Sequence, residues 1–549
     1  MNIYDYIEEE NKKYKPDYNL DNFKPLYRGD IGLIDDIISG EKYFVVIFTD
    51  FDCDGQSAGL IIKSMMDQFC VPYYWHISER QDGYGLKKSA LDSIVSKLSI
   101  NKKDGEKVVL FTADLGITNK DEVEYAYSIG FDKVIITDHH TPQEQLIPNA
   151  DLIVNQKFSD NIDEWVCGAG LVYMLFRDYE NELTKIIAGI ATVGDMVEMH
   201  YGSINRTIVK QSLKILNTTI LSDRILRMFL SELIYNFGKK EITEEDFGFS
   251  VCPAINSLSR MGETTLLKEF FDFDCINRKD KLKKIKEIND KRKEIQGKKE
   301  KEISTIDMSN ISKDNIEIFI LDNIDSSLLG LISSFILNTY GIDNICLKQL
   351  DDGSYKGSGR SKKNSMYNFL QHLMEYGAIG GGHTCACGLS VPEDKIGEVL
   401  NNYRNIPLIK QNIETQKIYT VDLSDIDDGL FLHIDKIKPF GNNNPAPLVR
   451  IDEVEIVKKK SVGSHIFALC EIGDGWDKIM YELLFFKAYD LKIKKGDRMS
   501  IIGTMSRDNI IVDRIVRWEF ISHFFFSTTE ITTLKYINNN EILSMGCQI

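Results

Sequence analysis

The sequence predicts an α/β protein: a parallel-sheet domain, a long connecting helix, a second α/β domain and a C-terminal β-barrel of the OB type. Three observations predict this order. Short runs of β-branched and aromatic residues alternate with helical patterns through roughly the first half of the chain. A long charged stretch without proline then follows. After about residue 450, five or so short strands with glycine-containing turns indicate a small barrel.

The parallel sheet is predicted from four short apolar runs, at 44–49, 108–113, 133–137 and 152–154. Three of these runs end directly in polar residues, namely Asp50, Asp114 and the triplet Asp138-His139-His140. Ligands of open parallel sheets collect at the carboxyl ends of the strands. Separate strands are therefore expected to bring these side chains to one point.

The connecting helix is predicted over 276–303, where Ile276, Leu282, Ile285, Ile288 and Ile295 recur at roughly helical spacing. Residues 276–302 contain 12 Lys and Arg against 6 Asp and Glu, in a chain whose net charge is -17. A charge run is usually a solvated face. Because its sign opposes that of the whole chain, a role facing phosphates is weighed equally with a solvated linker.

The second α/β segment is expected at about 315–415 and contains two glycine-rich motifs, at 357–361 and 380–383. The barrel strands are expected near 453–456, 465–469, 483–486 and 499–503. The last ~25 residues fit no pattern, as is common at chain ends.

The bulk composition limits the classes of function. At 549 residues the chain is expected to form about three domains, and the net charge of -17 points away from a generic nucleic-acid coat. A DNA partner would need a local basic groove. Ten cysteines without paired spacing, and an acidic start, predict reduced thiols in a cytoplasmic protein. Cys385 and Cys387 are interpreted as core or turn residues, and the apolar run 328–337 is too short for a membrane span.

The motif DFDCDG places Asp50, Asp52 and Asp54 at alternate positions after a strand. If the chain stayed extended, alternation would put the three carboxylates on one side. Clustered carboxylates favour a hard cation such as Mg²⁺ or Mn²⁺. A calcium-binding EF-hand begins in the same way, but it needs Glu at its twelfth position, where this chain has Ile61. The EF-hand interpretation therefore fails.

The pair His139-His140 beside Asp138 suits Mn²⁺ or another transition metal better than calcium. Each acidic residue also has a structural interpretation. Asp114 could be a helix N-cap at a strand–helix junction, and Asp195 could be a buried, hydrogen-bonded helix residue. Two adjacent histidines after a strand are harder to explain structurally.

Seen together, these motifs resemble a known family. TDFDCDG (49–55), TADLGIT (112–118), TDHHT (137–141), CGAGLVY (167–173) and ATVGDMVE (191–198) resemble the DHH phosphoesterase domain, and KGSGRS (356–361) and GGGHTCACGL (380–389) the DHHA1 domain. Further motifs resemble, more narrowly, those of the RecJ family of exonucleases. They are SERQDGYGL (78–86), LIVNQK (152–157), NRTIVKQSL (205–213), CPAINSLSRMGE (252–263), EINDKRKEIQ (287–296) and PFGNNNPAP (439–447).

The resemblance implies a role for each matching residue. The metal ligands would be Asp50, Asp52, Asp54, Asp114, His139 and Asp195, holding one or two Mn²⁺ or Mg²⁺ ions. The catalytic residues would be His140, at the scissile phosphate, with Asp138 and Asp54. The substrate would contact Arg360, Ser361, Gly381, Gly382 and His383 of the second domain and Asn256, Arg260, Arg80 and Tyr84 of the first.

The resemblance also implies an activity, a 5′→3′ exonuclease specific for single-stranded DNA. The expected domains are 1–270 (DHH, with an N-terminal extension), 271–310 (connecting helix), 311–415 (DHHA1), 416–525 (OB-like) and 526–549 (tail). Two rivals stay open: a phosphodiesterase for short oligonucleotides or cyclic dinucleotides, and a catalytically silent scaffold. A monomer is expected, assisted by a helicase or a single-strand-binding protein. No membrane partner is expected.

Aromatic residues of the barrel are the candidates for stacking on bases, although barrel aromatics are more often core. They are Phe467, Trp476, Tyr481 and Phe486. The chain also departs from the family pattern at three places. Asn443 stands where the family usually has glycine, Leu115 where Asn is commoner, and the pair Gln56-Ser57 is atypical. The turn around Asn443 is thus left undefined, but no proposed metal ligand is missing.

Overall fold

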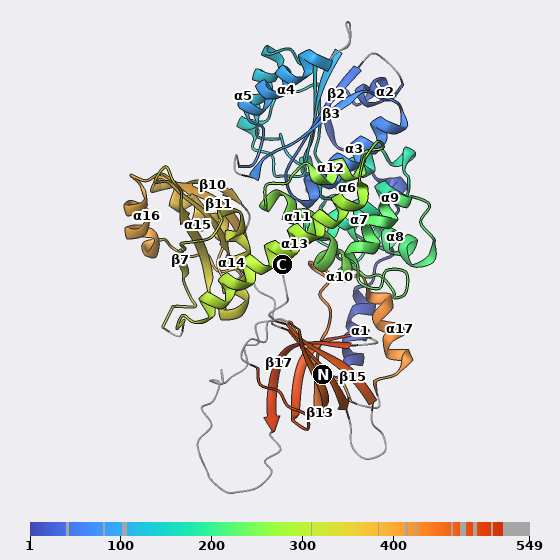
Figure 1. Ribbon diagram of the computed structural model, residues 1–549, viewed down its shortest axis with the longest axis vertical. Helices are drawn as coiled ribbons and strands as arrows, with labels where there is room; N and C mark the ends of the chain where they lie inside the picture. The colour runs from blue at the N-terminus through green and yellow to red at the C-terminus, as the bar shows by residue number, and fades with distance from the viewer. Residues whose placement is uncertain are drawn as a thin grey trace. The chain divides into compact units, whose positions relative to one another are not determined.

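The structure is a computed structural model of the 549-residue chain. It describes residues 1–39, 43–80, 83–101, 107–308, 310–382, 384–411, 416–422, 425–462, 465–472, 479–486, 491–506 and 509–519. Two compact units share the chain, and neither is one continuous segment (Figure 1). One unit consists of Tyr14–Ile295 with Pro439–Pro445. The other consists of Met1–Lys13, Gln296–Lys438 and the chain from Ala446 onward.

A six-stranded sheet forms the centre of the first unit, in the order β1-β6-β5-β4-β2-β3. The four predicted strands are present as β2 (Tyr43–Thr49), β4 (Lys107–Ala113), β5 (Lys133–Thr137) and β6 (Leu152–Val154), all parallel. The edges β1 (Tyr27–Gly29) and β3 (Tyr73–Ile77) were not predicted. β1 is antiparallel to β6, so the sheet is parallel except at one edge.

Alternate residues of each strand point to opposite faces of this sheet. Because both sets are apolar, helices cover both faces. Val45 and Ile47 belong to one apolar core, and Phe44 and Val46 to another. The second core is closed by α4 (Lys88–Asn101) and α5 (Lys120–Ser128). The first is closed by α2 (Gly32–Ile38), α3 (Cys53–Gln68), α6 (Gly168–Leu175), α7 (Glu182–Gly194), α8 (Ile204–Thr218), α9 (Arg224–Leu233), α11 (Cys252–Arg260) and α12 (Leu266–Phe271).

The connecting helix is α13 (Arg278–Ser304), close to the predicted bounds. Leu282, Ile285 and Ile288 are buried as expected, but Ile276 lies before the helix and is 78% exposed. Lysines of its first half are paired with carboxylates of other helices and loops of the same unit. The pairs are Lys281–Glu269, Lys284–Glu263 and Lys286–Glu232, at 2.5, 2.8 and 2.8 Å. These three ion pairs offset part of the positive charge of the helix on which the suggested phosphate-facing role was based.

The second α/β domain contains a five-stranded sheet in the order β10-β11-β9-β8-β7. Only β7 and β8 are parallel to each other. Its strands are β7 (Ile316–Ile320), β8 (Asp343–Gln349), β9 (Tyr355–Arg360), β10 (Ile379–Gly382) and β11 (Ala386–Val391), and its helices are α14 (Leu329–Tyr340), α15 (Met366–Glu375) and α16 (Ile396–Asn402). Cys387 is buried in β11 and Cys385 is exposed.

The C-terminal strands close into the expected barrel. β13 (Leu448–Val462), β14 (His465–Ile472), β15 (Ile479–Phe485), β17 (Asn509–Glu519) and β16 (Arg498–Met505) pair in this order, and β16 pairs back with β13. The short β12 (Ile418–Thr420) pairs with β13, and α17 (Asp428–Ile437) lies between these two strands in the sequence.

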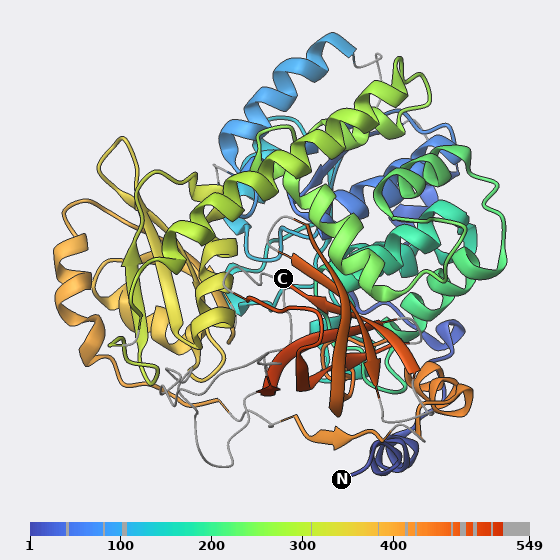
Figure 2. The same ribbon diagram turned by 60° about the horizontal axis from the view of Figure 1, so that its bottom comes forward.

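Helix α1 (Ile3–Lys13) packs beside α17 and β12, although the sequence suggested an extension of the first domain (Figure 2). Lys417 Nζ lies 2.8 Å from Glu9 Oε1, and the rings of Tyr6 and Tyr419 are 5.1 Å apart. The first thirteen residues therefore belong with the barrel rather than with the sheet that follows them. Within the described ranges, no helix is long and apolar enough to cross a membrane.

Candidate metal centre

The polar residues that follow three adjacent strands meet at one edge of the parallel sheet. β5, β4 and β2 are neighbours, and they end just before Asp138, Asp114 and Asp50. Their carboxyl ends face the same way because the strands are parallel. The convergence predicted from the strand ends is therefore present, and the local backbone decides how each side chain enters it.

The DFDCDG motif does not stay extended, so the condition under which its three carboxylates would lie on one side is not met. α3 begins at Cys53, and Asp52 is its N-cap: one side-chain oxygen accepts hydrogen bonds from the backbone N–H groups of Asp54 and Gly55. Asp54 thus lies in the first turn of the helix. A Cβ at Gly55 would lie 2.6 Å from the Asp50 carbonyl oxygen, which explains the glycine that closes the motif.

Asp54 is held by the N-terminus of another helix. Its two carboxylate oxygens accept hydrogen bonds from the backbone N–H groups of Gly168 and Ala169, at 2.6 and 2.8 Å. These are the first residues of α6, where unpaired N–H groups attract anions. A Cβ at Gly168 would lie 2.7 Å from Cβ of Asp114. The CGAG motif therefore lets two candidate ligands approach each other, a positioning role that the sequence did not reveal.

Asp114 is not a helix N-cap. The next helix, α5, begins six residues later, and Asp114 itself has the left-handed φ of 64° that is uncommon outside glycine. Its carboxyl group is buried, and its Oδ1 accepts no hydrogen bond from any residue the structure describes. His139 Nε2 lies 3.2 Å from that oxygen. A buried oxygen without a donor, facing an imidazole nitrogen, is the arrangement of two ligands around one cation.

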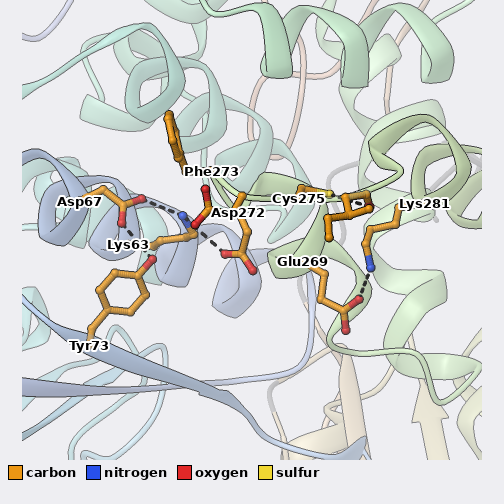
Figure 3. Close-up of a pocket in the computed structure, with 10 residues that line it drawn as sticks. Lys63, Asp67, Tyr73, Glu269, Asp272, Phe273, Cys275 and Lys281 are labelled. Carbon is orange, nitrogen blue, oxygen red and sulfur yellow. Dashed lines mark hydrogen bonds and ion pairs between the residues drawn. The ribbon is translucent and has the colours of Figure 1, made fainter. Parts of the chain in front are cut away.

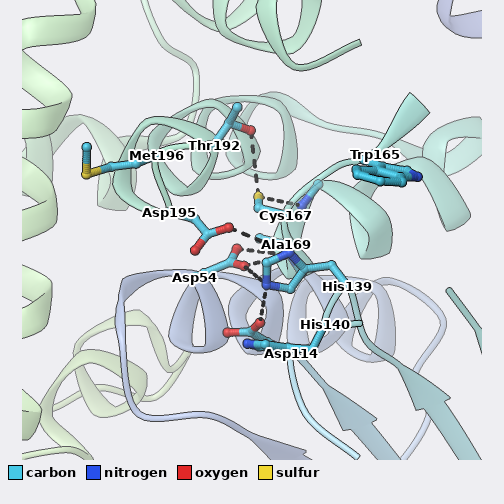
Figure 4. A network of polar contacts seen from close by, with 12 residues as sticks. Asp54, Asp114, His139, His140, Trp165, Cys167, Ala169, Thr192, Asp195 and Met196 are labelled. Carbon is cyan, nitrogen blue, oxygen red and sulfur yellow. Dashed lines mark hydrogen bonds and ion pairs between the residues drawn. The ribbon is translucent and has the colours of Figure 1, made fainter. Parts of the chain in front are cut away.

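His139 lies at the centre of the cluster (Figure 4). Its Nε2 is 3.2 Å from Asp114 and 3.9 Å from Asp54, and its Nδ1 is 3.7 Å from Asp195. Asp195 is the C-cap of α7, so it ends a helix rather than lying within one. Three groups of residues have ligand atoms within 4.8 Å of one another: Asp54-His139-Asp195, Asp114-His139-His140 and Asp50-Asp52-Asp114.

Asp138 and His140 form a hydrogen-bonded pair at the side of this cluster. Asp138 Oδ1 lies 2.8 Å from His140 Nδ1, and its Oδ2 accepts the backbone N–H of Ile117 at 2.9 Å. Burial alone would raise the pKa of Asp138, but His140 and the Ile117 amide outweigh it and hold the pKa at about 2. Burial lowers the pKa of His140, and the Asp138 carboxylate outweighs this and raises it. The Tyr84 hydroxyl lies 2.9 Å from His140 Nδ1.

Burial and mutual repulsion disfavour the charged forms of four other carboxyl groups of the cluster. Burial, and then repulsion from Asp52, raise the pKa of Asp50 to about 7 and that of Asp54 to about 6. Burial and repulsion from Asp54 also raise the pKa values of Asp114 and Asp195. Buried carboxylates that repel one another are stabilised by a divalent cation. The overlapping groups, the Asp/His donors and the unbonded Asp114 oxygen fit one or two ions of the Mn²⁺ or Mg²⁺ kind.

The predicted substrate residues of this unit lie around the same edge. Asn256 Oδ1 accepts the backbone N–H of Cys53 at 2.9 Å, so it braces the DFDCDG turn. The guanidinium of Arg80 stacks over Phe51 at 4.2 Å and is 3.4 Å from Ser259 Oγ. Arg260 is the last residue of α11 and is partly exposed. Ser78, which sequence analysis passed over, donates to Asp50 Oδ1 at 3.1 Å.

The predicted substrate residues of the second domain differ in whether they are exposed or already hydrogen-bonded within that domain. Arg360 Nη1 donates to Ser358 Oγ and to the Gly359 carbonyl. Ser361 is buried and donates to Asp343, so its hydroxyl is engaged inside the domain. Gly381 is exposed with open space around it, whereas Gly382 lies close against β11. His383 lies outside the described residues.

A cavity of about 520 Å³ lies elsewhere in the same unit and shares no residue with the metal cluster (Figure 3). Its charged groups are largely paired within it. Lys63 Nζ is 2.7 Å from Asp67 and 3.7 Å from Asp272, and Lys281 pairs with Glu269.

Three family models match successive parts of the chain. The DHH family N-terminal domain matches residues 44–194, the DHHA1 domain residues 314–406 and the RecJ OB domain residues 419–511. The chain is a RecJ-like DHH/DHHA1 protein. The first model spans Asp50 through the last residue of α7, and therefore every candidate ligand except Asp195.

Among curated relatives, the single-stranded-DNA-specific exonuclease RecJ of Bacillus subtilis is 25% identical over 489 residues, covering 84% of this chain and 59% of that protein. RecJ of Escherichia coli is 26% identical over 384 residues, 64% of each chain. This RecJ-like chain thus spans less than two thirds of the length of either relative.

Solved structures show the same fold. RecJ from Thermus thermophilus in complex with Mn²⁺ has a TM-score of 0.65 at 18% identity, covering 90% of this chain and 71% of that one. An exonuclease RecJ bound to manganese has a TM-score of 0.55 at 19% identity, covering 69% and 94%.

Proposed function

We propose that this RecJ-like protein is a metal-dependent nuclease that hydrolyses single-stranded DNA from its 5′ end and releases 5′-mononucleotides. The observation that carries the proposal is the position of His139, within 4 Å of carboxylate oxygens of Asp54, Asp114 and Asp195 at the carboxyl edge of a DHH sheet. The names of the relatives in B. subtilis and E. coli support the substrate, and the 5′ polarity rests on the family resemblance.

In this proposal, Asp54, Asp114, His139 and Asp195 hold the cations, with Asp50 and Asp52 completing the acidic edge. Bound Mn²⁺ or Mg²⁺ would supply Lewis acidity at the scissile phosphate. His140 faces the same space. Because Asp138 raises its pKa, its imidazole carries a positive charge over a wider pH range and can stabilise negative charge that develops on the phosphate. Tyr84 and Asp138 fix the orientation of that ring.

A polymeric substrate is supported by the outer face of the barrel. Phe467 pairs across the strands with Lys460, and Leu469 with Lys458. These four side chains are at least partly exposed, so apolar surface alternates with positive charge, as in surfaces that bind single strands. Of the other predicted aromatics, Phe486 is 45% exposed, Tyr481 is buried in the core, and Trp476 lies outside the described residues.

The test uses four substrates with the full chain and Mn²⁺: a 5′-labelled single strand, a 3′-labelled one, a blunt duplex and a dinucleotide. Release of labelled mononucleotide from the 5′ end, with the duplex intact, is the expected result. Asp54→Asn and His140→Ala should abolish it. Asp121→Asn, an exposed carboxylate on α5, and His372→Ala, a partly exposed histidine on α15, are the matched controls that should retain it.

Other outcomes would replace the proposal. Cleavage of the dinucleotide but not of the long strand would indicate a small-substrate phosphodiesterase. No cleavage of any substrate by protein that binds Mn²⁺ would indicate a silent scaffold. If a nuclease is established, adding a helicase or a single-strand-binding protein would then test for an assisting partner.

A further inference from the structure

The segment Pro439–Pro445 belongs to the metal-binding unit, although it lies in the sequence between α17 and the first long strand of the barrel. It forms a tight turn: Gly441 and Asn444 exchange backbone hydrogen bonds of 2.9 and 3.0 Å. Asn443 occupies the turn with φ of 59°. Asn tolerates this left-handed conformation better than other residues with a side chain, which explains how it replaces the glycine usual in the family.

The base of this turn is held firmly by buried groups. The fully buried guanidinium of Arg206 donates to the carbonyl oxygen of Pro439 at 2.7 Å, and the Asn444 side chain donates to the same oxygen at 2.7 Å. The backbone N–H of Phe440 donates to Glu244 Oε1, also at 2.7 Å. Because a buried Arg must keep its partners, the segment is fixed to α8 and to the turn that begins at Glu244.

The tip of the turn reaches the loop that directly follows Asp195. The side-chain amide of Asn442 donates to the carbonyl oxygen of Met196 at 3.1 Å, and the carbonyl of Asn442 accepts the backbone N–H of Met199 at 2.8 Å. Asn442 is therefore hydrogen-bonded to the loop at two residues, Met196 and Met199. A Cβ at Gly441 would lie 2.4 Å from Met199 Cε, so the turn approaches this loop closely.

The loop needs such support because its backbone is strained. Met196 has φ of 56°, the left-handed conformation that side-chain-bearing residues rarely adopt, and it is joined directly to the candidate ligand Asp195. Strained residues persist where their surroundings hold them. Asp195 itself is the C-cap of α7 and has His139 Nδ1 3.7 Å away.

We propose that Asn442 is a positioning residue for the metal centre: by fixing Met196 and Met199, it holds the carboxylate of Asp195 in the place where a cation is bound. The inference rests on the proposed ligand role of Asp195. It assigns to the PFGNNNP motif, which precedes the barrel in the sequence, a task within the DHH unit, namely to set the affinity for the cation. Partners that orient metal ligands commonly change affinity by about 10- to 100-fold.

The experiment measures Mn²⁺ binding to the full chain, by the EPR signal of free Mn²⁺, for wild type, Asn442→Ala, Asp195→Ala and the double variant. Asn442→Ala should weaken binding about tenfold or more. Asn443→Gly, its neighbour in the turn, is the matched control, because glycine keeps the positive φ and should leave binding unchanged. Melting temperatures in EDTA verify that every variant is folded.

The double variant separates positioning from a general structural effect. If Asn442 acts through Asp195, Asn442→Ala should cause no further loss of affinity in the Asp195→Ala background. An equal loss in both backgrounds, or wild-type binding by Asn442→Ala, would overturn the positioning role alone. Wild-type binding by Asp195→Ala would instead overturn the ligand assignment on which both proposals rest.

Discussion

Asp114 and Asp138 follow neighbouring strands at equivalent places, yet their environments are opposite. Asp138 receives hydrogen bonds from Ile117 and His140, and its pKa is held at about 2. Asp114 has a buried oxygen that accepts no hydrogen bond from the described part of the chain, and burial and neighbouring carboxylates raise its pKa. The position of each residue at the end of a strand therefore determines which side chains lie close together. The hydrogen-bond donors around each carboxylate then determine whether it orients a neighbouring side chain or is available to ligate a cation.

The largest effect is expected from Asp114→Asn. The amide cannot ligate a cation as a carboxylate does, so Mn²⁺ affinity should fall at least about 100-fold and nuclease activity should be lost. Metal-free protein at pH 8 should melt a few degrees higher, because a charge repelled by Asp54 and Asp52 is gone. Calorimetry in EDTA and in Mn²⁺ measures both; a lower melting temperature in EDTA would contradict the assignment.

Asp138→Asn should have the opposite sign in EDTA. Here the carboxylate is satisfied, and losing a hydrogen bond to a charged group costs about 1.5–3 kcal/mol, so the metal-free protein should melt lower. Activity should fall by about 10²–10⁴ because His140 loses the group that orients and charges it. Mn²⁺ affinity should change much less than in Asp114→Asn. Equal losses of affinity in the two variants would erase the distinction between the two carboxylates.

The pH dependence tests the strained carboxylates directly. A carboxylate whose folded pKa is raised contributes stability below its unfolded pKa, near 4, and this is lost as pH rises through the folded value. Asp54 and Asp50 have folded pKa values of about 6 and about 7. Metal-free protein should therefore lose stability between pH 4 and 7, and the rise in melting temperature caused by Mn²⁺ should be larger at pH 8 than at pH 5.5. A rise independent of pH would place the bound ion elsewhere.

The smallest effect is expected from Tyr84→Phe. The change removes the hydroxyl that lies 2.9 Å from His140 and 3.4 Å from Asp138, while Asp138 still holds the ring. A lost hydrogen bond of about 0.5–1.5 kcal/mol corresponds to a fall in activity of several-fold. Mn²⁺ binding should not change, and steady-state kinetics beside a Mn²⁺ titration would show both.

The sequence predicted well what depends on periodicity and poorly what depends on tertiary contacts. The runs at 44–49, 108–113 and 133–137 are strands because β-branched residues are buried on both faces. The polar residues at their ends were therefore placed together. Asp52 was not identified as the N-cap of α3, although its cap bonds to the N–H groups of Asp54 and Gly55 are local. Nothing in the sequence indicated the left-handed φ of Asp114.

The same limit applies to long-range packing. The location of residues 439–445 beside the Asp195 loop required the buried contact with Arg206, which lies 233 residues earlier in the chain. The paired lysines of α13 likewise depend on carboxylates of other elements, so the charge count alone could not choose between a solvated face and a phosphate-facing one.

The division of each unit between distant stretches of chain has a consequence for synthesis on the ribosome. The metal-binding unit reaches Ile295 and then lacks Pro439–Pro445 until about 150 more residues have been made. At 5–20 residues per second this interval is on the order of ten seconds or more. Throughout it the Pro439 carbonyl to which Arg206 donates does not yet exist, so this contact forms only after the later segment has been made. Folding of the cation site should therefore be completed late, when the linker into the barrel emerges.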